Sequence, residues 1–262
     1  VCAGVRVRST HGADVKNGVA VLYHVVVFGL AVRVEIHALR RSRGRDSLEP
    51  EGVAVSPDDS IVVNTSETTS MAHLIDWRNK KIVANILVDP RPRYAEYDKD
   101  GSELWVTSEV GGTVSIIDPV SFKELRRIPT GKEPHHLYLT PDEKSLMVAN
   151  ALADSLTLVD PKTGQVQRVL DGIADPYQLR FSPDMKWFIT AANRLNHVDI
   201  YRSAPRQGGG VDLALAKRVS TGKTPSHINI DSKSTVVYVT MQDSDELIAI
   251  DLATQSPRWK VP

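Results

Sequence analysis

Side chains that could bind a ligand recur at fixed distances after five prolines, which are Pro50, Pro92, Pro134, Pro176 and Pro225. The second and fourth residues after these prolines include histidine, tyrosine, glutamate, glutamine and arginine, which recognise small molecules through hydrogen bonds and charge. The predicted ligand-binding residues, counting one neighbouring arginine, are Arg93, Tyr94, Glu96, His136, Tyr138, Gln178, Arg180 and His227. The pattern predicts no catalytic residue and no metal site, and it indicates no particular cofactor.

His136 and His227 share one register, two residues after Pro134 and Pro225. Neutral imidazole is a common ligand of metals, but an intervening repeat separates the two histidines. A ligand that spans both is therefore favoured over a shared metal ion. The alternative is structural, because buried polar side chains usually pair with one another. The sequence leaves both interpretations open.

Basic and aromatic residues adjoin the same positions in the predicted loops. Arg91, Arg93, His135 and Tyr177 lie one residue before or after the repeat prolines. Such a combination would suit an anionic small molecule or cofactor.

Common enzyme signatures are missing from the sequence. It contains no G-x-S-x-G turn, no phosphate-binding P-loop and no H-E-x-x-H helix. Asp98, Asp100 and Gly101 resemble the start of a calcium loop, but the other acidic ligands at that spacing are absent, so an ordinary turn is favoured.

The prolines define five sequence units. Pro50, Pro92, Pro134 and Pro176 follow one another at intervals of 42 residues (92−50, 134−92, 176−134), and Pro225 follows after 49 (225−176). Repeats of this length are typical of propellers and related arrays. The units are residues 50–91, 92–133, 134–175, 176–224 and 225–262, whereas residues 1–49 lack the repeat.

Each unit has the pattern of four short strands. An apolar strand follows the proline, a turn such as Ser56-Pro57-Asp58 comes next, and β-branched and aromatic residues dominate the second strand. Third and fourth strands close most units, and the extra residues of the fourth unit predict a longer hairpin loop at Gly208–Gly210. Because one such sheet cannot bury both faces, neighbouring sheets must stack. The sequence therefore predicts an all-β β-propeller of about five four-stranded blades, and it leaves open whether the ring is complete.

Composition narrows the possible partners. Lys and Arg total 32 and Asp and Glu total 32, so no net charge attracts the chain to nucleic acid or to an anionic membrane. Cys2 is the only cysteine, which excludes an intrachain disulfide and a thiolate zinc cluster. Residues 18–34 are mostly apolar, but His24 and Arg33 interrupt them, so neither a membrane span nor a clean export signal is predicted.

The turn and second strand resemble the YVTN family of bacterial β-propellers, whose signature is Pro-Asp-Gly followed by Tyr-Val-Thr-Asn. SPDDSIVVNTS and DKDGSELWVTS carry this resemblance here, and the similarity covers residues 50–262. More narrowly, the segments Glu49–Asp76 and Arg91–Asp118 resemble propellers that accompany quinoprotein (PQQ-dependent) alcohol catabolism.

The resemblance implies a periplasmic, non-enzymatic propeller that binds a ligand or a protein partner, accessory to a quinoprotein oxidation system. Similar propellers also include haem-binding domains and lactone hydrolases. The alternative is thus a lactonase-like or haem-dependent enzyme with its site at the mouth of the axial channel. A DNA-binding propeller is a third possibility, which the neutral charge disfavours.

The shared register of the two histidines yields a test. Replacing His136 and His227 together by Ala should abolish ligand binding while leaving the melting temperature nearly unchanged. Calorimetry with and without ligand measures both quantities. A large loss of stability with intact binding would show that the histidines are structural.

Overall fold

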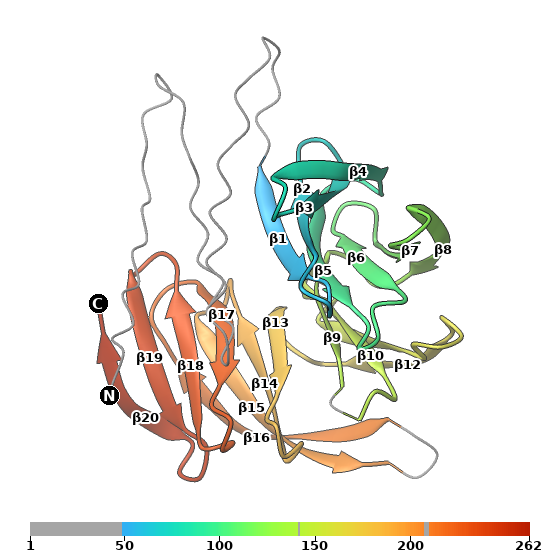
Figure 1. The fold of residues 1–262 in the computed structure, drawn as a ribbon. Coiled ribbons are helices and arrows are strands. Elements are labelled where there is room, and N and C mark those ends of the chain that lie inside the picture. Colours follow the sequence, from blue (N-terminus) through green and yellow to red (C-terminus); the bar gives the residue numbers. More distant parts are fainter. Residues whose placement is uncertain (1–48, 141, 207–209) are drawn as a thin grey trace. The chain divides into compact units, whose positions relative to one another are not determined.

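A computed structural model describes residues 49–140, 142–206 and 210–262. These residues form twenty β-strands in five four-stranded antiparallel sheets, with one short 3₁₀ helix at Ala151–Ala153. In each sheet the strands are neighbours in sequence order, so every sheet is a simple meander. The predicted all-β fold of four-stranded blades is confirmed. In Figure 1 the first strand of each blade lies toward the middle and the fourth lies outside.

Every blade begins at its repeat proline. Blade 1 contains β1 (Pro50–Val55), β2 (Ile61–Ser66), β3 (Met71–Asp76) and β4 (Lys81–Leu87). Blade 2 contains β5 (Pro92–Tyr97), β6 (Leu104–Ser108), β7 (Thr113–Asp118) and β8 (Lys123–Pro129). Blade 3 contains β9 (Pro134–Leu139), β10 (Leu146–Asn150), β11 (Ser155–Val159) and β12 (Val166–Asp171). Blade 4 contains β13 (Pro176–Phe181), β14 (Trp187–Ala192), β15 (His197–Pro205) and β16 (Val211–Ser220). Blade 5 contains β17 (Pro225–Ile230), β18 (Val236–Met241), β19 (Glu246–Asp251) and β20 (Ser256–Val261).

Polar side chains close the turn between the first and second strands. The backbone amide of Ile61 donates to Ser56 Oγ over 2.9 Å, and hydrogen bonds from Ser56 and Ser60 lower the pKa of Asp58 to about 2. In blade 2 the amide of Glu103 donates to Asp98 Oδ1 over 3.0 Å, and Ser102 donates to Asp100 over 2.9 Å. The two aspartates that resembled a calcium loop therefore serve as acceptors within the turn.

The hydrophobic core lies between consecutive blades rather than within one sheet. Side chains alternate along each strand, so Leu104 and Val106 pack toward blade 1 while Trp105 packs toward blade 3. Four buried apolar clusters fill the junctions between blades 1 and 2, 2 and 3, 3 and 4, and 4 and 5. The first strands follow the same order, because β1 lies against β5, β5 against β9, β9 against β13 and β13 against β17.

A threonine hydrogen bond joins the first blades at their inner strands. Thr65 Oγ1 accepts the amide of Gly52 over 2.7 Å within its own blade and donates to the carbonyl oxygen of Arg93 in the next blade over 3.0 Å. Thr107 repeats both bonds, because it accepts the amide of Tyr94 over 3.0 Å and donates to the carbonyl oxygen of His135 over 2.8 Å. These bonds fix the height of each inner strand against the next.

The long hairpin of blade 4 carries the extra residues of its repeat. β15 and β16 pair from His197 and Ser220 to Pro205 and Val211, which places the extra residues between the third and fourth strands, as expected. The predicted glycine loop itself lies partly outside the described residues, since the structure leaves out 207–209, and residues 1–48 of the non-repeat segment lie outside them as well. No helix within the described ranges is long and apolar enough to cross a membrane.

The threonine bonds predict unequal effects of one substitution at two equivalent positions. Thr240 of blade 5 has the register of Thr107 (240−225 and 107−92) and accepts the amide of His227 over 3.2 Å, but in the described part of the chain it donates to no further blade. Thr107→Val should therefore lower the free energy of unfolding by about 1 kcal/mol more than Thr240→Val, because only Thr107→Val leaves a neighbouring carbonyl unpaired. Denaturant unfolding of both variants measures the difference, and equal losses would contradict the role of Thr107 at the junction.

Candidate functional site

A polar pocket opens where the first strands of the blades begin. We call this end of the blades the mouth. The pocket has a volume of about 200 Å³ and is lined by residues of blades 2, 3 and 4. The lining residues are Arg93, Glu109, Glu133, His135, Ala151, Asp175, Tyr177, Asn193 and Arg194. We refer to this hollow as the mouth pocket.

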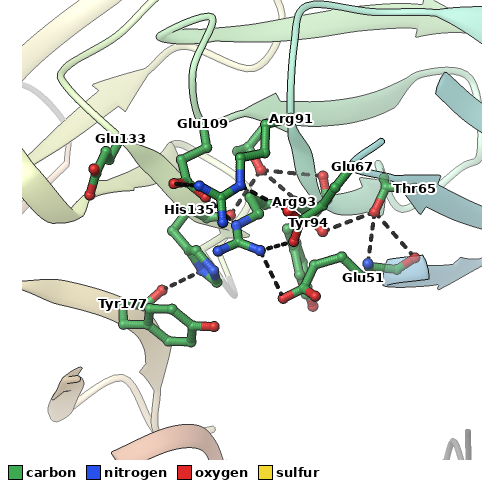
Figure 2. Close-up of polar contacts among 12 residues, drawn as sticks. Glu51, Thr65, Glu67, Arg91, Arg93, Tyr94, Glu109, Glu133, His135 and Tyr177 are labelled. Atoms are coloured by element: carbon green, nitrogen blue, oxygen red, sulfur yellow. Dashed lines mark hydrogen bonds and ion pairs between the residues drawn. The ribbon is translucent and has the colours of Figure 1, made fainter. Parts of the chain in front are cut away.

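Arg93 is the centre of an ion-pair network that joins blades 1 and 2 (Figure 2). Its guanidinium pairs with Glu67 and with Glu109, and it lies 3.4 Å from Glu51 Oε1. Arg91 reinforces the network, at 2.8 Å from Glu67 and 3.1 Å from Glu109. Burial raises the pKa of Glu51, and the charge of Arg93 opposes this shift.

Gly52 makes this network possible. A Cβ at position 52 would overlap the carbonyl oxygen of Arg93 and come within 2.9 Å of Thr65 Oγ1. The backbone of blade 2 therefore approaches blade 1 here at a distance that only glycine allows. This approach brings Arg93 within reach of the glutamates of blade 1.

A second ion-pair set lies on the opposite side of the mouth pocket. Arg194 lies 2.7 Å from Asp175 and 3.0 Å from Glu133, which links blades 4 and 3. Burial raises the pKa of Asp175, while hydrogen bonding to Arg194 opposes that shift.

Carboxylates outnumber guanidinium groups around the mouth. Glu51, Glu67, Glu109, Glu133 and Asp175 face Arg91, Arg93 and Arg194, and each of these arginines forms at least two ion pairs. The anionic ligand expected from the sequence was based on the basic and aromatic residues of these loops, and the structure pairs the arginines with carboxylates. The charge balance of the mouth favours a cationic group.

His135 contributes a neutral imidazole to the mouth pocket. Its Nδ1 lies 3.0 Å from the carbonyl oxygen of Tyr177, and because a carbonyl only accepts, Nδ1 carries the proton. Burial, and then the charge of Arg93, lowers the pKa of His135 well below its usual value. The ring stacks on Tyr177 with centroids 3.6 Å apart, and Nε2 has no hydrogen-bond partner among the described residues. His135 is thus a fixed acceptor.

Farther along the inner strands, six of the predicted residues form a second group, which we call the channel cluster: Tyr94, Glu96, His136, Tyr138, Arg180 and His227. The rings of Tyr94 and His136 lie 4.0 Å apart, and the guanidinium of Arg180 lies 5.3 Å above the ring of Tyr138. The charge of Arg180 acts on the pKa of the other five members. These residues come from β5, β9, β13 and β17.

The surroundings of the channel cluster keep most of its members uncharged. Burial raises the pKa of Glu96 to about 8, against the opposing charge of Arg180. Burial also lowers the pKa values of His136 and His227 and raises that of Tyr94. The side chain of His227 is exposed to solvent.

The remaining two predicted residues lie elsewhere. Gln178 accepts a hydrogen bond from the amide of Ile228, so its side chain joins blades 4 and 5. Arg93 belongs to the mouth. His136 is 1% exposed and packs on Tyr94, so replacing it by Ala would also remove buried packing, and the nearly unchanged melting temperature expected from the sequence does not apply to this position. The described residues contain no group of three or more side chains suited to a metal ion.

The acidic residues of the mouth were missed by the sequence analysis, although the repeat carries a signal for them. Glu67, Glu109, Ala151 and Asn193 all lie seventeen residues after a repeat proline (67−50, 109−92, 151−134, 193−176). This register follows the second strand, whose end lies beside the start of the first strand because the two are antiparallel. Comparing the residues at this register with those that flank each proline would have identified Glu67 and Glu109 as residues of the mouth.

The raised pKa of Glu96 predicts a pH-dependent difference between the wild type and Glu96→Gln. Between the ordinary pKa of 4.5 and about 8 the unfolded chain releases this proton while the folded protein keeps it. The free energy of unfolding therefore falls with rising pH, by at most about 1.4 kcal/mol per unit from this group. Glu96→Gln has no such group to titrate, so its free energy of unfolding should rise relative to that of the wild type between pH 5 and pH 8. Denaturant titrations of both proteins across that range measure the gap, and a constant gap would refute the assignment.

Comparison with solved structures places the fold among known propellers. A functionally unknown protein from Desulfotomaculum acetoxidans superposes with a TM-score of 0.69 at 15% identity, over 84% of this chain and 73% of that one. Hydrazine synthase from Kuenenia stuttgartiensis superposes with a TM-score of 0.58, also at 15% identity, over 86% of this chain and 90% of that one. At this identity the likeness concerns the fold alone.

No curated protein sequence matches the chain. A family model does: the one described as YNCE-like beta-propeller matches residues 95–262, which include most of blade 2 and all of blades 3 to 5. The match covers more than half of the chain, and the five four-stranded blades agree with it. The chain therefore belongs to the YNCE-like β-propeller family.

Proposed function

We propose that this protein is a binding propeller whose mouth pocket takes a small ligand that carries an amine or another cationic hydrogen-bond donor. The observation that carries the proposal is the combination of excess carboxylate with one neutral acceptor, His135 Nε2, for which the described part of the chain offers no partner. A buried acceptor without a partner is costly. A donor on the ligand would satisfy it.

The shape of the mouth pocket supports a small ligand. Three consecutive blades contribute its walls, and each wall is held by hydrogen bonds or ion pairs that need no ligand. Such a site is formed before the ligand arrives, so little ordering free energy opposes binding. The ring of Tyr177 adds an aromatic surface that attracts cations.

Binding of small amines tests this function. Ethanolamine and spermidine should bind the wild type more tightly than glycerol, which lacks the charge. Glu133→Gln should weaken amine binding by roughly tenfold, because loss of one charge next to a partly desolvated cation removes about 1 to 2 kcal/mol. Isothermal titration calorimetry measures both comparisons.

Glu124→Gln is the matched control. Glu124 forms an ion pair of 2.8 Å with Arg127 on β8 and does not line the mouth pocket, so its loss should leave amine binding unchanged. Equal affinities for amines and glycerol, or equal effects of the two substitutions, would remove the proposed function.

Hydrolysis of a lactone is a second candidate function, favoured by the state of His135. A neutral imidazole oriented through Nδ1–H has the arrangement of a general base. Nε2 would take a proton from water as the water oxygen attacks the lactone carbonyl, and the imidazolium would return that proton to the ring oxygen as its bond to the acyl carbon breaks, leaving a hydroxy acid. Turnover of lactones by the wild type but not by His135→Asn would support this function over binding alone, and a visible absorption band on adding haem would support a haem protein instead.

The cellular setting is also a proposal. The resemblance of residues 49–76 and 91–118 to propellers of quinoprotein alcohol catabolism supports a periplasmic protein accessory to such a system. Fractionation of cells that express the natural gene would test the compartment. Recovery of the protein in the cytoplasmic fraction would count against this setting.

A further inference from the structure

Among the residues that the structure describes, no carboxylate lies within ion-pair distance of Arg180. Its Nε atom is buried and has no hydrogen-bond partner among the described residues, and its guanidinium lies over the ring of Tyr138 instead of against an acid. This is unlike Arg91, Arg93 and Arg194 of the mouth, which all form ion pairs. A partly buried charge without a counter-ion is costly.

The atoms around Arg180 are also unsatisfied. Glu96 Oε2 and both ring nitrogens of His136 are buried and have no hydrogen-bond partner within the described residues. These unpaired polar atoms come from three neighbouring inner strands, β5, β9 and β13. A purely structural network would pair such groups with one another.

We propose that the channel cluster binds one small carboxylate, with the Arg180 guanidinium as its counter-ion and the carboxyl group of Glu96 as a hydrogen-bond donor. The guanidinium offers two parallel N–H groups that match a carboxylate. His136 and the hydroxyl groups of Tyr94 and Tyr138 supply further hydrogen-bonding groups around it.

The protonation of the channel cluster at neutral pH agrees with one anion. Glu96 is the only acid of the cluster, and its pKa of about 8 keeps it protonated, so its O–H can donate. His136 and His227 are neutral because burial lowers their pKa values, and Tyr94 and Tyr138 keep their protons because burial raises theirs. The charge of Arg180 therefore remains uncompensated.

This inference goes beyond the binding of amines at the mouth and does not rest on it. The mouth has an excess of carboxylates, whereas the channel cluster has one unpaired cation. The two sites therefore select ligands of opposite charge, and each can fail without the other.

Titration with sodium acetate, with acetamide as the neutral analogue of the same shape, tests the proposal. Calorimetry or ligand-observed NMR at pH 7 should show acetate binding and no acetamide binding. Arg180→Gln should weaken acetate binding at least tenfold. The matched control is Arg202→Gln, because Arg202 also lies over an aromatic ring, that of Trp187 at 4.8 Å, but on β15 away from the cluster.

The pH dependence supplies a second readout that needs no change at Arg180. Between pH 7 and pH 9 acetate remains fully ionised, while Glu96 of the wild type loses its proton, pairs with Arg180 and repels the ligand. Affinity should therefore fall above pH 8, by up to about tenfold per unit. In Glu96→Gln, whose amide is neutral, the affinity should stay constant.

The outcomes separate the alternatives. Two results together support the proposal. Arg180→Gln weakens acetate binding while Arg202→Gln leaves it unchanged, and Glu96→Gln abolishes the pH dependence of acetate binding. Equal binding of acetate and acetamide, unchanged binding in Arg180→Gln, or the same pH profile in Glu96→Gln overturns it. If Arg180→Gln does not fold, the comparison of acetate with acetamide and the Glu96→Gln profile decide. Amine binding sensitive to Glu133→Gln would leave the function of the mouth standing in every case.

Discussion

Burial of apolar side chains between consecutive blades is the interaction on which the rest of the structure depends. Each blade is a four-stranded sheet with apolar residues on both faces, and one sheet can bury only the face that another sheet covers. The four buried clusters therefore each draw side chains from two blades. Trp105 illustrates the constraint: it is 1% exposed and packs in a cluster that combines residues of its own blade 2 with residues of blade 3.

Packing alone would allow the inner strands to slide against one another, and hydrogen bonds remove that freedom. Thr65 and Thr107 each bond the carbonyl oxygen of the next inner strand. Blade 3 has Ala149 at this register and cannot make the bond, and there His135 Nδ1 donates to the carbonyl oxygen of Tyr177 instead. Between blades 4 and 5 Asn193 donates to the carbonyl oxygen of Pro225, while Gln178 accepts from Ile228. Hydrogen bonds thus fix all four junctions, through threonine at the first two, histidine at the third, and asparagine and glutamine at the fourth.

At the junction between blades 3 and 4, one side chain, His135, contributes both to stability and to the mouth pocket. Because His135 Nδ1 donates the hydrogen bond across this junction, where Ala149 occupies the threonine register, only Nε2 is left as an acceptor in the mouth pocket. The same side chain therefore holds two blades together and presents a chemical group. The ion pairs of Arg93 and Arg194 act similarly, since they join blades 1 and 2 and blades 3 and 4 while they line the same hollow.

The sequence by itself determined the blades. Three features were sufficient to predict them: the spacing of Pro50, Pro92, Pro134 and Pro176, the turn residues, and the β-branched second strands. Strand and turn preferences are local, and the repeat shows them five times. Equal registers on equivalent strands also singled out Tyr94, Glu96, His136, Tyr138, Arg180 and His227, together with Arg93 and Gln178, which the structure places elsewhere.

Only the tertiary structure decided how those side chains are paired. Arg93 and Arg180 both follow a repeat proline closely, yet Arg93 forms ion pairs with three glutamates, whereas Arg180 forms none among the described residues although Glu96 lies near it. The glutamates that neutralise Arg93 come from blades 1 and 2, at a register that looks unremarkable until the ends of antiparallel strands are brought together. Charge balance depends on distances across blades, and those distances are set by packing between sheets that no local pattern of residues contains.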